Sequence, residues 1–132
     1  MSHMKAKIGE YAIISNSKKQ ILIMQLNNPE HTWHFPGGRL NIGDEAVEGL
    51  RREVKEETGL NIFDIEPIHT QIFTEEKKYG VFFTAKTTEP IDIKISFEHR
   101  DFRWITKKEL DNINFWQHFY KKLVEKAFER LD

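Results

Sequence analysis

Three glutamates close together, Glu53, Glu56 and Glu57, are the side chains of this sequence best suited to chemistry. We expect a helix from about Glu45 to Thr58, ended by Gly59 as a C′ glycine. Residues three and four apart are neighbours on a helix surface, so the three carboxylates lie together and repel one another. A hard divalent cation such as Mg²⁺ or Mn²⁺, which prefers oxygen ligands, would balance their charge. A solvated acidic face fits the same spacing, and the glutamates alone leave both interpretations open.

The spacing around the glutamates is more specific. Gly38 is followed after five residues by Asp44, and after seven more by the run from Arg52 to Leu60, REVKEETGL. This pattern resembles the Nudix box, G-x5-E-x7-R-E-U-x-E-E-x-G-U, in which U is aliphatic. Eight of the nine fixed positions match, and the ninth is Asp44, where the pattern has Glu. The residues just before, from Trp33 to Gly38, resemble the usual lead-in to that box.

The resemblance implies hydrolysis of a phosphoanhydride in a nucleoside diphosphate linked to another group, with Mg²⁺ as cofactor and Mn²⁺ as an alternative. Carried over by position, Glu53, Glu56 and Glu57 are the metal ligands. One of them, or a carboxylate from another loop, is the general base that orients water. Gly37 and Gly38 let the backbone approach the metal and phosphates closely, and Gly38 is included in the metal site.

Two more positions of the box carry expectations of their own. Arg52 would hold a glutamate in place by a charge-assisted contact, although we expect it on the flank of the acidic cluster. Asp44 is one methylene short for the partnership with Arg52 that a glutamate makes, which we expect to soften positioning without abolishing activity. Asp44 also suits the N-cap of the helix, and the two roles can coexist.

Outside the box, the candidates are weaker. Glu98 lies in a stretch that resembles the region where many Nudix enzymes supply an extra acid, and its alternative is a surface charge. His99 is a lesser candidate there. Arg39 would meet a phosphate or remain solvated. Tyr79 and Phe73 would stack on a base or pack in the core as strand aromatics.

Two histidines flank a tryptophan in the lead-in. His31 and His34 have a spacing compatible with metal binding, but the chain has no cysteine and no third ligand nearby. We therefore expect them to be loop residues, one of which touches substrate.

The remaining sequence predicts the elements that position the site. Apolar runs and turn residues predict strands over residues 11–14, 21–24, 33–36, 62–74, 79–87, 91–97 and 102–105. Thr106 and Glu109 fit a capping box that opens a brief helix ending near Asn112. A long amphipathic helix follows from about Asn114, and its apolar face packs on the sheet or forms a dimer contact. On the box helix, the predicted core-facing residues are Ala46, Val47, Leu50 and Val54.

This mixed pattern predicts an α+β or α/β sandwich, with a mixed sheet between the box helix and the C-terminal helix. The Nudix resemblance implies the same α/β/α sandwich. Residues 1–3 resemble an expression-tag remnant, and residues 4–132 are expected to form a single domain, as a monomer or homodimer.

The charge composition limits the kinds of partner that we expect for this protein. The chain has 20 basic and 21 acidic side chains, a net charge of −1. That balance offers no general attraction to nucleic acid or an anionic membrane, so we expect a small-molecule nucleotide substrate. With no cysteine, no signal pattern and no long apolar run, a cytoplasmic protein is the simplest expectation.

The substrate is the least determined feature. The short domain lacks the sequence markers of several Nudix subgroups and looks most like those that cleave nucleoside triphosphates to a monophosphate and pyrophosphate. A dinucleoside polyphosphate, ADP-ribose or a nucleotide sugar remain alternatives. A rival of another class is a non-catalytic, nucleotide-binding regulatory module, although such modules tend to lose box carboxylates that this chain keeps.

Overall fold

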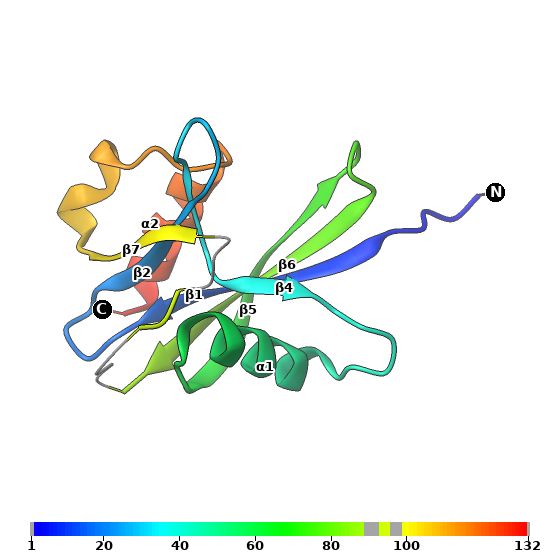
Figure 1. The fold of residues 1–132 in the computed structure, drawn as a ribbon, viewed down its shortest axis with the longest axis horizontal. Coiled ribbons are helices and arrows are strands. Elements are labelled where there is room, and N and C mark those ends of the chain that lie inside the picture. Colours follow the sequence, from blue (N-terminus) through cyan, green and yellow to red (C-terminus); the bar gives the residue numbers. More distant parts are fainter. Residues whose placement is uncertain (1, 89–92, 96–98, 132) are drawn as a thin grey trace.

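The computed structural model describes residues 2–88, 93–95 and 99–131. Within these residues, one mixed sheet contains all the strands (Figure 1), in the order β3-β2-β1-β6-β5, with β4 also paired to β1 and β7 to β2. The β1–β6 pair is parallel, and the other pairs are antiparallel. The strands are β1 (Lys7–Ser15), β2 (Ile21–Leu26), β3 (Trp33–His34), β4 (Gly37–Arg39), β5 (Ile62–Phe73), β6 (Lys78–Thr87) and β7 (His99–Ile105).

Two hydrophobic cores lie on the two faces of the sheet, because side chains of a strand alternate in direction. From β1, Ala12 and Ile14 pack with the box helix α1 (Ala46–Thr58), while Ile13 packs with the C-terminal helix α2 (Tyr120–Arg130). The predicted α/β/α sandwich is therefore confirmed (Figure 1).

The box helix begins one residue later than predicted and ends where predicted. Its N-cap is Glu45, whose side chain accepts a hydrogen bond from the Glu48 N–H at 2.9 Å, so the expectation that Asp44 caps the helix is wrong. Gly59 is left-handed, with φ of 80°, and its N–H donates to the Lys55 carbonyl.

The part of α1 that packs on the sheet is shorter than the predicted apolar stripe. Ala46 is exposed and Val47 is only half-buried, whereas Gly49, Leu50, Val54 and Thr58 are buried. The helix thus lies on the sheet from Gly49 onward, and its first turn, which contains Ala46, is open to solvent.

The glycine pair, for which no strand was predicted, lies in a strand. Residues 37–39 make β4, which pairs antiparallel with residues 9–11 of β1. A side chain at Gly37 would bring a Cβ within 2.0 Å of the Glu10 carbonyl oxygen. Glycine therefore lets the two backbones approach closely, which a propensity-based prediction does not include.

The lead-in strand is shorter than predicted. The expected strand over residues 33–36 ends at His34, because proline has no N–H for a ladder. The Pro36 carbonyl instead accepts a hydrogen bond from the Ala12 N–H at 2.9 Å.

The first two strands, although consecutive in the chain, scarcely pair with each other. β1 and β2 pair only at Ser15 and Ile21, and β1 pairs along its whole length with β6. That partner is about 70 residues away, so no local turn signal marks it.

The C-terminal third shows two further differences and one confirmed prediction. Of the predicted strand over 91–97, residues 91–92 and 96–97 lie outside the described residues, and residues 93–95 have no regular secondary structure. β7 is longer than predicted. The capping box is confirmed at the 3₁₀ helix η1 (Lys107–Asn112), where the Thr106 N–H donates to Glu109 Oε1 at 2.9 Å.

The long helix begins at Tyr120 rather than near Asn114. The Asn114 carbonyl accepts from the Trp33 N–H at 2.9 Å, and the Trp116 N–H donates to the Trp33 carbonyl at 2.8 Å. These hydrogen bonds hold the segment in an extended path beside β3, so it cannot join the helix.

Candidate functional site

The box glutamates of α1 face the glycine strand β4. A Cβ added at Gly38 would lie 2.5 Å from Glu53 Oε2, so only a glycine leaves that carboxylate its present place. Glu57 Oε2 lies 3.5 Å from the Gly37 nitrogen. The Glu56 side chain is more open, with 62% of its surface exposed. The carboxylates of Glu53 and Glu57 thus border the backbone of β4.

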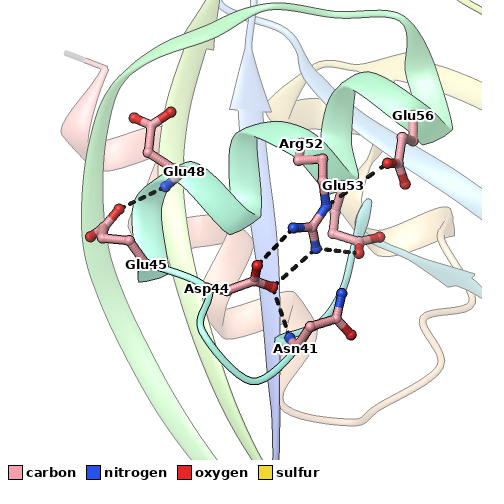
Figure 2. Close-up of polar contacts among 7 residues, drawn as sticks. All are labelled: Asn41, Asp44, Glu45, Glu48, Arg52, Glu53 and Glu56. Atoms are coloured by element: carbon pink, nitrogen blue, oxygen red, sulfur yellow. Dashed lines mark hydrogen bonds and ion pairs between the residues drawn. The ribbon is translucent and has the colours of Figure 1, made fainter.

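Arg52 lies within the acidic cluster rather than on its flank, as Figure 2 shows. Its guanidinium donates to Glu53 Oε1 at 3.1 Å, and its Nε lies 3.8 Å from Glu56 Oε1. The predicted contact that holds a glutamate in place is therefore present.

Asp44 pairs with Arg52 in spite of its shorter side chain. Arg52 donates to both carboxylate oxygens of Asp44, at 2.9 and 3.1 Å, and the Asn41 N–H donates to Asp44 Oδ2 at 2.7 Å (Figure 2). The hydrogen bond from Arg52 and then that from Asn41 lower the pKa of Asp44. Hydrogen bonds to Asp44 and Glu53 raise the pKa of Arg52. One missing methylene thus does not prevent this partnership, because the loop that carries Asp44 approaches the helix.

A further carboxylate, Glu10 of β1, was missed by sequence reasoning. Its side chain is 2% exposed, and its Oε1 has no hydrogen-bond partner among the described residues. Burial, followed by the charges of Glu45 and Asp44, raises the pKa of Glu10 to about 7. The available signal was an acidic residue directly before the apolar run of residues 11–14.

The donor set of this site suits a divalent cation. It consists of carboxylate oxygens, which Mg²⁺ and Mn²⁺ prefer, together with the room left by Gly38 and the unpartnered oxygen of Glu10. Within the described ranges, no three acidic, histidine or cysteine side chains are already gathered as ligands. Holding a cation would therefore require rotation of side chains that now contact Arg52.

The candidates outside the box are dispersed. Arg39 is exposed on β4, and Glu98 lies outside the described residues. Phe73 is buried in the core beneath α2. Its register partner in β6 is Lys78, and Tyr79, the next residue, points to the opposite face of the sheet. Phe73 and Tyr79 therefore cannot stack on the same base.

Among the candidate histidines, His31 stands apart from a pair formed by half-buried His34 and buried His99. His31 is exposed, with φ of 50°. His34 Nε2 lies 2.7 Å from His99 Nε2, so one ring donates to the other. Burial, followed by the charges of His99 and Lys78, lowers the pKa of His34 to about 3. The pair joins β3 to β7, a connection that sequence spacing does not reveal.

An aromatic cluster around Lys78 was also missed. The Lys78 ammonium donates to the Tyr11 hydroxyl at 2.9 Å and lies 4.7 Å from the Phe73 ring centroid and 5.5 Å from that of Trp116. Tyr11 is the register partner of Gly37, so the cluster borders the glycine strand. Four separate segments contribute to it, which is why no local pattern predicts it.

None of the helices in the described part of the chain is long and apolar enough to cross a membrane.

Comparison with known proteins gives one consistent family. The NUDIX domain model matches residues 7–127. The chain is 30% identical over 93 residues to a Caenorhabditis elegans asymmetrical bis(5'-nucleosyl)-tetraphosphatase, covering 66% of this chain and 67% of that protein.

Solved structures agree on the fold. A MutT protein from Methanosarcina mazei superposes with a TM-score of 0.76 and 27% identity, covering 99% of this chain and 98% of that one. A C. elegans Ap4A hydrolase binary complex superposes with a TM-score of 0.74 at 24% identity, covering 93% and 97%.

Proposed function

The chain belongs to the Nudix family of hydrolases, which act on phosphoanhydride bonds, and from this premise we propose that it is a Mg²⁺-dependent nucleoside triphosphate pyrophosphohydrolase. Water would attack the α- or the β-phosphorus of the triphosphate, and the bond from that phosphorus to the oxygen that bridges the two would break. The products are a nucleoside monophosphate and pyrophosphate.

The observation that carries this proposal is the placement of Glu53 and Glu57 of α1 against the glycine backbone of β4. A bound Mg²⁺ would neutralise charge on the phosphate oxygens and lower the pKa of a coordinated water. Glu53, Glu56 and Glu57, with the Gly38 backbone, are the residues proposed to hold it. Arg52, itself fixed by Asp44, orients Glu53 and Glu56.

The remaining steps fall to protein groups around the cation. A box glutamate, or Glu98, accepts a proton from the attacking water. The absence of side chains at Gly37 and Gly38 would let the metal and the phosphates approach the β4 backbone closely. Exposed Arg39, which follows in β4, is available to meet a terminal phosphate.

The aromatic cluster around Lys78 supports a nucleotide as the substrate. Trp116 is 37% exposed and stacks on Phe73 with a centroid separation of 6.4 Å. Its open surface is available to a base, because aromatic rings stack on nucleobases of any identity. Tyr11 of the cluster is the register partner of Gly37, so a base there would lie next to β4, on the face of the sheet that carries α2.

A second candidate is the asymmetrical cleavage of a dinucleoside tetraphosphate. The observation that favours it is the similarity to the C. elegans tetraphosphatase, 30% over 93 residues. The same carboxylates and glycines would act, and only the group beyond the phosphates would differ.

The test is a panel of nucleoside triphosphates, dinucleoside tetraphosphates, ADP-ribose and nucleotide sugars, each incubated with Mg²⁺ and analysed for products. We expect pyrophosphate and a monophosphate from a triphosphate. A triphosphate and a monophosphate from a dinucleoside tetraphosphate would instead favour the second candidate.

Two variants make the test specific to the site. Glu57→Gln should lower kcat by about 100-fold or more, since a metal-site carboxylate supplies several kcal/mol of transition-state stabilisation. Glu48→Gln is the matched control on the same helix, exposed and paired with Arg51 at 3.4 Å, and should leave activity unchanged. Nucleotide binding without turnover of any substrate would contradict the proposal and favour a regulatory module.

A further inference from the structure

Glu10 is an unusual residue for its position. It lies in β1, a central strand flanked there by β4 and β6, and its side chain is 2% exposed. Within the described part of the chain, its Oε1 is the one buried side-chain oxygen or nitrogen that lacks a hydrogen-bond partner. A buried carboxylate without a partner is costly, so a charge at this position requires an explanation.

The side chain of Glu10 points to the face of the sheet that carries α1. Side chains alternate along a strand, and Ala12 and Ile14 of β1 pack with Leu50 and Val54 of α1. Glu10 has the same parity as Ala12 and Ile14. It therefore shares a face with the box glutamates rather than with the aromatic cluster.

The strand register places Glu10 opposite Gly38, the glycine against which Glu53 lies. Glu10 and Gly38 are directly opposed in the antiparallel β1–β4 pair, so their Cβ positions lie about 5 Å apart. A Cβ at Gly38 would be 2.5 Å from Glu53 Oε2. The Glu53 carboxylate thus occupies the place that a side chain at Gly38 would take, directly across the strand pair from Glu10.

The cation present in this cluster does not neutralise Glu10. The guanidinium of Arg52 forms ion pairs with Asp44, Glu53 and Glu56. The charges that act on the Glu10 carboxyl are those of Glu45 and Asp44, and both are negative. A positive ion at the box carboxylates would supply the partner that the protein does not.

We propose that Glu10 is an additional acidic residue of the divalent-cation site, giving a carboxylate oxygen to the cation or to a water bound to it. Glu10 lies outside the box and 28 residues before Gly38, so no box pattern includes it. This inference rests on the proposed function, because it requires the box carboxylates to hold the cation.

The test is Mn²⁺ affinity, measured by calorimetry and by the electron paramagnetic resonance signal of free Mn²⁺, without substrate. Glu10→Gln should bind Mn²⁺ about tenfold or more weakly than the wild type, as expected when a supporting ligand is removed. Glu66→Gln, an exposed glutamate of β5, is the matched control and should bind as the wild type does.

Folding is checked by thermal unfolding of the metal-free variants. Glu10→Gln should unfold at the wild-type temperature or above it, because the substitution removes a buried charge. If this variant does not fold, Glu10→Met, of similar size and without a carboxylate, replaces it in the same measurement.

The possible outcomes distinguish the role of Glu10 from the cation site at the box carboxylates. Wild-type affinity in Glu10→Gln, with weakened binding in Glu57→Gln, overturns the role of Glu10 and leaves the proposed function intact. No Mn²⁺ binding by the wild type, or no effect of Glu57→Gln, overturns the cation site of the proposed function and this inference with it. Weakened binding in both variants but not in Glu66→Gln supports both.

Discussion

A side chain would be obstructed at each of the two glycines of β4, but by different neighbours. At Gly37 a Cβ would meet backbone, with the Glu10 carbonyl oxygen at 2.0 Å and the Tyr11 Cα at 2.8 Å. At Gly38 it would meet the end of a side chain, Glu53 Oε2 at 2.5 Å. A flexible side chain can rotate away, whereas paired strands cannot separate without losing their ladder. Gly37 is therefore required by the strand pairing, whereas Gly38 leaves the Glu53 carboxylate its place.

This difference predicts opposite effects for two alanine substitutions. Gly37→Ala should destabilise the protein by about 3 kcal/mol or more, or prevent folding, since overpacking against backbone is not relieved by rotation. Gly38→Ala should fold with a free energy of unfolding within about 1 kcal/mol of the wild type, yet bind Mn²⁺ at least about tenfold more weakly because Glu53 is displaced. Urea unfolding and Mn²⁺ titration of both variants measure the two effects. Equal stability of the two variants would contradict this division of roles.

At the scale of elements, the C-terminal end of α1 is fixed by Thr58. This residue is completely buried, and its hydroxyl donates to the Val54 carbonyl at 2.7 Å while accepting from the Leu60 N–H at 3.1 Å. Its carbonyl accepts from the Lys94 N–H at 3.1 Å. Glu56 and Glu57 directly precede Thr58. The hydrogen bonds of Thr58 therefore hold the end of the helix that carries these two glutamates.

Removing the Thr58 hydroxyl should lower the free energy of unfolding of the domain. Thr58→Val keeps the shape but leaves the Leu60 N–H without its acceptor, and a buried unsatisfied group costs about 1–3 kcal/mol. Thr70→Val, at an exposed position of β5, is the control and should change stability by no more than about 0.5 kcal/mol. Chemical denaturation of the three proteins gives the comparison, and equal midpoints would show that Thr58 does not anchor the helix end.

At the scale of the molecule, the histidine pair joins strands on both sides of β2. His34 of β3 is the register partner of Met24, and His99 of β7 is that of Leu26. The pKa of His34 is lowered to about 3, first by burial and then by His99 and Lys78. In the unfolded chain a histidine titrates near 6.5, so between these values the unfolded state binds more protons.

The part of the free energy of unfolding that depends on neutral His34 should therefore be fully present above about pH 6.5. It should be lost as the pH falls from 6.5 toward 3. The slope has a ceiling of about 1.4 kcal/mol per pH unit for one proton. Glu10 acts in the opposite direction, because its raised pKa of about 7 favours the folded state as the pH falls from 7 toward 4.5. The difference between wild type and His34→Gln isolates the histidine.

The measurement is the free energy of unfolding of the metal-free protein from pH 7.5 to pH 4.5. His34→Gln should show a smaller loss on acidification than the wild type, while His31→Gln, at an exposed position, should follow the wild type. Parallel curves for all three proteins would contradict the assignment to His34.

The sequence by itself determined the box helix, its glycine stop and the capping box at Thr106, as well as the family and the two-layered packing around a sheet. These features depend on contacts between residues one to four apart, or on a repeating pattern along one element, which a single chain segment carries within itself. The roles of Glu53, Glu56 and Glu57 remain predictions on the same basis.

Only the tertiary structure decided which distant segments meet. It placed β1 beside β6, laid Gly37–Arg39 against β1, buried Glu10 beneath α1 and gathered three aromatic rings around Lys78. It also held residues 114–116 beside β3 and out of the helix that their pattern favours. Such contacts join residues tens of positions apart, and their stability comes from packing and hydrogen bonds that exist only once the sheet has formed.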